Sequence, residues 1–148
     1  MARIIRSIED NVESIYHRFH PLNLQEKNFF AESLIHSGCV LAANTKAKAI
    51  CTLTSSGYSA SMLSHFRPKA DIFIFSRKKD LLTRLSLYWG VRSYYYERTK
   101  ATDETISDLE EILKKHKHIH KGDAFITMAS IPIESRQRVN MLKITVTS

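Results

Sequence analysis

A loop rich in hydroxyl groups follows a strongly apolar run of this sequence and surrounds a single glycine. It reads TSSGYS, and its candidate ligand-binding residues are Thr54, Ser55, Ser56, Gly57 and Ser59. Hydroxyl groups and the backbone N–H groups at the start of a helix donate hydrogen bonds to anions, and the helix dipole favours negative charge there. The glycine permits backbone conformations and close approaches that a side chain would block. The loop therefore has the chemistry of a phosphate site.

Two uses of this loop stay open when the pattern is taken alone. Serine and glycine are also common in tight turns and helix caps, and the pattern by itself favours that use. A P-loop does not fit, because Tyr58 and Ser59 stand after the glycine, where lysine and threonine would be needed.

Other residues of types that can bind metals or catalyse reactions fit structural roles better. His116, His118 and His120 straddle the expected end of a helix, so their rings need not converge on a metal ion. Cys39 and Cys51 lie far apart in apolar contexts, and we expect buried free thiols. Paired carboxylates placed for acid–base catalysis are also missing. We therefore expect no catalytic residue, no metal ligand and no cofactor in this chain.

The elements that would position the loop alternate along the chain. Apolar runs with strand character lie at Ala49–Thr54, Ala70–Ser76, Val91–Glu97, Asp123–Ala129 and Leu142–Thr147. Helical patterns between the first four of them cover Ser59–Phe66, Lys78–Trp89 and Glu104–Lys117. Such alternation predicts an α/β fold, a three-layer open sheet of five mostly parallel strands with helices on both faces. The last strand follows without an intervening helix, so we expect it to run antiparallel at the sheet edge.

Two further helices are expected before the first strand. An amphipathic pattern runs from Ile4 to Phe19 and stops before Pro21, and a second helical pattern runs from Phe29 to Leu41. The 148 residues suit one domain, without internal repeat or linker. The chain shows neither a signal peptide nor an apolar run of roughly 20 residues, so we expect a cytoplasmic protein that does not enter a membrane.

The net charge of +7 favours acidic partners, which include nucleic acid, anionic membranes and phosphorylated small molecules. The basic residues are scattered rather than gathered in one arm, which disfavours nucleic acid. A basic nucleic-acid-binding module nevertheless stays as an alternative, and the steepness with which affinity falls with salt would test it.

Several motifs occur in the order and spacing of one known family. The stretch KAKAICTLTSSGYSASMLSHFRPKADIFIFS resembles the pattern strand, Thr-x-Ser-Gly-x-Ser/Thr-Ala, helix, Arg-Pro, strand. The residues in register with it are Thr54, Ser56, Gly57, Ser59, Ala60, Phe66, Arg67 and Pro68. LSLYWGV, HKGDAFITMASIPI and the N-terminal IEDNVESIYHRF continue the likeness over nearly the whole chain. Together these motifs resemble the C-terminal domain of pyruvate kinase.

The resemblance implies a piece of an enzyme that moves phosphate from phosphoenolpyruvate to ADP. In that family the catalytic groups, Mg²⁺ and usually K⁺ belong to a TIM barrel that precedes this domain. Residues 1–148 would then be a single C-terminal domain without the barrel, either excised or a natural remnant, and would not catalyse the reaction. The resemblance also implies contact with the barrel, a dimer contact between C-terminal domains and a tetramer in the full-length enzyme.

The family's C-terminal domain serves regulation, and fructose 1,6-bisphosphate, AMP or sugar monophosphates bind it in different members. Carried over, Thr54, Ser55, Ser56, Gly57 and Ser59 would hold an effector phosphate. The last loop, SIPIESRQRVN, departs from the family because it has no glycine. This loop carries two arginines, Arg136 and Arg138. They either contact the phosphate or lie solvated on the surface. This departure leaves the effector unnamed, and a stand-alone phosphate sensor of the same fold remains the alternative.

Overall fold

The computed structural model describes the chain except for residues 1, 12–17, 19–24, 26, 98–101 and 132–137. Its helices are α1 (Ala2–Asn11), α2 (Phe29–Thr45), α3 (Tyr58–Phe66), α4 (Lys79–Leu85) and α5 (Thr102–Lys115). Its strands are β1 (Ala49–Leu53), β2 (Asp71–Ser76), β3 (Val91–Tyr95), β4 (Ala124–Ala129) and β5 (Met141–Val146). The strands lie where the apolar runs predict them, to within one or two residues.

One five-stranded sheet organises the described part of the chain, with the strand order β3-β2-β1-β4-β5. The pairs β1–β2, β1–β4 and β2–β3 are parallel, whereas β5 pairs antiparallel with β4. The predicted α/β fold and the antiparallel edge strand are therefore confirmed. The antiparallel return is possible because a loop, rather than a crossover helix, joins the last two strands.

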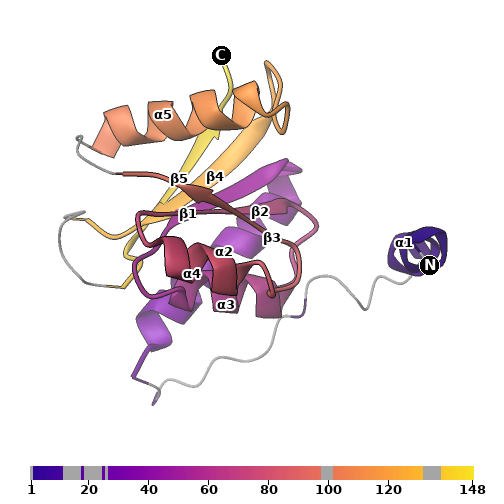
Figure 1. The fold of residues 1–148 in the computed structure, drawn as a ribbon, viewed down its shortest axis with the longest axis horizontal. Coiled ribbons are helices and arrows are strands. Elements are labelled where there is room, and N and C mark those ends of the chain that lie inside the picture. The colour runs from indigo at the N-terminus through magenta and orange to yellow at the C-terminus, as the bar shows by residue number, and fades with distance from the viewer. Residues whose placement is uncertain (1, 12–17, 19–24, 26, 98–101, 132–137) are drawn as a thin grey trace.

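Helices cover both faces of the sheet and bury an apolar core on each side. In Figure 1, α5 lies over one face, while α2, α3 and α4 lie over the other. Ile50, Ile74 and Met128 belong to the cluster under α2, α3 and α4, whereas Phe75 and Phe125 belong to the cluster under α5. Side chains of successive strand residues point to opposite faces, so continuous apolar strands supply both clusters.

The helix predicted over Lys78–Trp89 is shorter than expected, because α4 ends at Leu85. The N–H groups of Leu87 and Tyr88 donate to carbonyls three residues earlier, at 3.3 and 3.1 Å. The chain therefore leaves the α-helix through tighter turns, whose backbone hydrogen bonds span three residues instead of four.

The N-terminal helix is described only as far as Asn11, so the remainder of the predicted Ile4–Phe19 helix lies outside the described residues. Figure 1 shows α1 standing apart from the sheet and its covering helices. Ile4, Ile5 and Ile8 are at least half exposed on it. Among the described residues, no helix has the length and apolar character needed to cross a membrane.

Candidate anion-binding site

Three segments meet at the carboxyl edge of the parallel strands. The loop 54–57 follows β1, α4 follows β2, and the loop that carries Arg138 follows β4. Because β1, β2 and β4 run parallel, their carboxyl ends point the same way. This edge is where open α/β sheets bind ligands.

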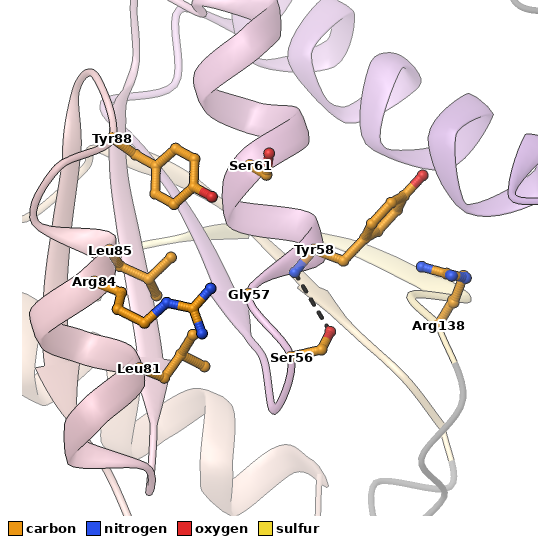
Figure 2. A pocket seen from close by; sticks show the side chains of 9 residues that line it. All are labelled: Ser56, Gly57, Tyr58, Ser61, Leu81, Arg84, Leu85, Tyr88 and Arg138. Atoms are coloured by element: carbon orange, nitrogen blue, oxygen red, sulfur yellow. Dashed lines mark hydrogen bonds between the residues drawn. The ribbon is translucent and has the colours of Figure 1, made fainter.

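A cavity of about 310 Å³ lies at this edge. The residues that line it come from the loop, the first turn of α3, α4 with the turn after it, and the final loop; they are Ser56, Gly57, Tyr58, Ser61, Leu81, Arg84, Leu85, Tyr88 and Arg138. Figure 2 shows Arg84 and Arg138 on opposite sides of the turn formed by Ser56 and Gly57. The cavity is of the size that accepts a small metabolite.

Side chains of the loop accept hydrogen bonds from the backbone of the turn that leads into α3. The N–H of Gly57 donates to Oγ1 of Thr54 at 2.9 Å, and the N–H of Tyr58 donates to Oγ of Ser56 at 3.4 Å. Helix geometry leaves the next N–H groups, those of Ser59 and Ala60, without an intrahelical acceptor. The loop thus orders its own turn through these hydrogen bonds and leaves backbone donors at the positive end of the helix dipole.

Gly57 adopts a left-handed conformation, with φ of +84°. A Cβ atom at this position would lie 3.0 Å from Cδ1 of Leu81 and 3.4 Å from Cδ2 of Leu85. The glycine therefore serves two needs at once. It permits the turn, and it lets α4 approach the loop closely enough to form one wall of the cavity.

The opposite wall is held by a chain of contacts from the final loop to α2. The guanidinium carbon of Arg138 lies 4.2 Å from the centroid of the Tyr58 ring, a cation–π contact. The Tyr58 hydroxyl donates in turn to the carboxylate of Glu32 on α2. Burial, then the hydrogen bond and the negative charge of Glu32, raise the pKa of Tyr58 to about 12. Tyr58 therefore stays protonated at neutral pH and keeps Arg138 beside the cavity.

The cavity is electropositive. Two arginines line it, and its described lining residues include no carboxylate. The start of α3 adds a partial positive charge. An anion is the complementary ligand.

Only some of the residues predicted to bind phosphate line the cavity. Ser56, Gly57 and Arg138 line the cavity, while Thr54 acts from behind as the acceptor for the N–H of Gly57. Ser55 is exposed and is not among the lining residues, and Ser59 is buried at 4% exposure. Arg136 lies outside the described residues.

Sequence reasoning missed the residues that α4 and its following turn supply. Arg84 and Tyr88 were not predicted, and neither was Ser61 in the first turns of α3. A signal for Arg84 existed, because helices that follow neighbouring parallel strands begin at the same sheet edge. A cation in the following short helix, such as Arg84 in the last turn of α4, can therefore face the loop.

The histidines near the end of α5 have different neighbours in the structure. The Tyr94 hydroxyl and Nε2 of His118 lie 2.7 Å apart, and His120 lies beside Asp123 instead. Burial, then the charge of Arg92, lowers the pKa of His118. Within the described residues, no group of three histidine, cysteine or acidic side chains could hold a metal ion.

Comparison with known proteins gives the family. The family model described as "Pyruvate kinase, alpha/beta domain" matches residues 32–145. The chain belongs to this family. The family resemblance of the sequence motifs is therefore confirmed.

Similar proteins include pyruvate kinase of Clostridium acetobutylicum, 29% identical over 99% of this chain and 31% of that protein. Plastidial pyruvate kinase 2 of Arabidopsis thaliana is 30% identical over 84% of this chain and 22% of that protein. The chain thus spans less than a third of the length of these relatives. A crystal structure of a pyruvate kinase from Cryptosporidium parvum covers 99% of this chain and 29% of its own, with a TM-score of 0.81 and 22% identity. This structural similarity supports the assignment of the chain's fold.

Proposed function

We propose that this chain is the effector-binding and assembly domain of a pyruvate kinase, an enzyme that transfers phosphate from phosphoenolpyruvate to ADP. The observation that carries the proposal is the cavity at Gly57, where hydroxyl groups, the start of α3 and two arginines surround about 310 Å³. Its ligand would be a phosphorylated metabolite such as a sugar phosphate or a nucleoside monophosphate. Binding such a ligand in the cytoplasm would couple the enzyme to the supply of metabolites.

The cavity is suited to binding a ligand rather than to catalysing its reaction. Its described lining residues include no histidine, carboxylate or cysteine that could activate a nucleophile or transfer a proton at neutral pH. The phosphoryl transfer, with its Mg²⁺ and K⁺, is accordingly assigned to the barrel domain of the family. Purified residues 1–148 should form no ATP from phosphoenolpyruvate and ADP, and turnover that copurifies with the chain would contradict this assignment.

The assembly role is supported by two apolar surfaces on the described residues. Ile4, Ile5 and Ile8 are exposed on α1, and Ile144 and Val146 are 42% and 64% exposed on β5. β5 is also an edge strand of the sheet, so one side of its backbone can pair with another strand. Two-fold symmetry would pair β5 with its own copy in antiparallel fashion, as an isologous dimer contact.

Isothermal titration calorimetry against fructose 1,6-bisphosphate, glucose 6-phosphate, ribose 5-phosphate and AMP tests the effector role. We expect at least one ligand to bind with a 1:1 stoichiometry, and inorganic phosphate to compete with it. Adenosine and fructose, which lack phosphate, are the matched controls and should give no heat of binding. No binding of any phosphorylated ligand at millimolar concentration would contradict the proposal.

A further inference from the structure

Arg84 of α4 faces the same cavity from the side opposite the final loop. We propose that Arg84 binds a second anionic group of the ligand and so sets the specificity of the site. The inference rests on the proposed function, because it concerns the same cavity. It narrows the ligand class to organic phosphates that carry a second phosphate or carboxylate group.

The position of Arg84 follows from how α4 packs. Leu81 and Leu85 are buried, at 8% and 1% exposure, and their side chains lie against Gly57. Residues three and four apart share a helix face, so Arg84 lies on the face that these leucines turn toward the loop. Figure 2 shows its guanidinium group directed at the Ser56–Gly57 turn.

The charge of Arg84 is not neutralised by the protein. Asp80 stands four residues earlier on α4, at the spacing of a helical ion pair. No ion pair joins the two, and Arg84 has no other ion-pair partner among the residues that the structure describes. Its five N–H donors thus remain available to a ligand, and a guanidinium binds phosphate or carboxylate through two parallel hydrogen bonds.

The two arginines of the cavity are held in different ways. Arg138 is stacked on Tyr58, beside the start of α3, whereas Arg84 stands across the turn on α4. A phosphate at the start of α3 would use Arg138 and the hydroxyl of Ser56. A second anionic group on the same ligand would extend toward α4 and use Arg84.

The test is calorimetric titration of the native chain, R84Q and R77Q with fructose 1,6-bisphosphate and fructose 6-phosphate. Arg77 is the matched control, since it is exposed in the turn between β2 and α4 and does not line the cavity. Losing one hydrogen-bonded charge contact should weaken bisphosphate binding by about 10- to 100-fold in R84Q. Monophosphate binding by R84Q, and both affinities of R77Q, should stay within about twofold of native values.

Each other outcome overturns the inference. Equal effects of R84Q and R77Q on the bisphosphate would mean that only the overall charge matters. An equal loss for both ligands in R84Q would place Arg84 at the first phosphate. If the ligands bind the native chain and R84Q alike, the cavity binds phosphate without Arg84, whereas no binding to the native chain would refute the proposed function as well. Circular dichroism of each variant shows whether its fold is retained.

Discussion

Substituting Gly57 by alanine should destabilise the protein and deform the cavity together. The φ of +84° places this residue in the left-handed region, where a side chain costs about 1–2 kcal/mol. The added Cβ would also meet Leu81 at 3.0 Å. Displacing a packed side chain in this way costs about 1–2 kcal/mol more. We therefore expect the free energy of unfolding to fall by about 2–4 kcal/mol.

Gly122 provides the matched control for that substitution. Its φ of +87° is nearly the same, but a Cβ there would meet nothing within 4 Å. G122A should therefore carry only the backbone cost, about 1–2 kcal/mol. Urea unfolding followed by circular dichroism gives both values, and in a chain of this size each kcal/mol also lowers Tm by about 2–4 °C. Equal losses in G57A and G122A would refute the claim that Gly57 is required for the close approach of α4.

Three further outcomes are expected. Tyr58 should titrate at higher pH than an ordinary tyrosine, because its pKa is raised to about 12. In the unfolded chain the Tyr58 hydroxyl ionises near the ordinary pKa of about 10. The hydrogen-bonded Tyr58 hydroxyl therefore stabilises the fold fully below about pH 10, and this stabilisation is lost as the pH rises toward about 12. In an absorbance titration at 295 nm, Y58F should lack the late step, and an unchanged titration curve would contradict the hydrogen bond to Glu32. Burial raises the pKa of Cys39 to about 12 and raises that of Cys51 further. Both thiols should therefore react slowly with Ellman's reagent in the native protein and rapidly in guanidinium chloride. Rapid reaction of the folded chain would show that the thiols are accessible to solvent. If α1 takes part in the proposed dimer, I5E should shift the light-scattering mass toward the monomer, and an unchanged dimer would exclude this helix from the contact.

The fold could be predicted from sequence because its strands are continuous apolar runs that end in turn residues. The end of α4 could not, since the helical pattern of the sequence continues to Trp89 while the backbone tightens after Leu85. The α-helix ends at Leu85, whereas the left-handed glycine that follows, Gly90 with a φ of +70°, comes five residues later.

The sequence predicted the part of the candidate site that the two loops supply, which is Ser56, Gly57 and Arg138. Ser56 and Gly57 follow a strand, so their position at the carboxyl edge follows from the topology. Arg84 lies on a different element, and its direction depends on how Leu81 and Leu85 pack against Gly57. That contact is tertiary, and no local pattern encodes it.

The central claim is that the Ser56–Gly57 turn binds a phosphate group, and S56D tests it most directly. Ser56 is exposed, and a carboxylate can accept the hydrogen bond from the N–H of Tyr58 as the serine hydroxyl does, so the fold should be retained. S55D is the control, because Ser55 is exposed beside it but does not line the cavity. In calorimetric titration with fructose 1,6-bisphosphate, S56D should weaken binding more than about tenfold through like-charge repulsion, and S55D should change it by less than about threefold. Equal affinity of S56D and the native chain would contradict the account, since the loop would then be only a turn with a helix cap and the ligand would bind elsewhere.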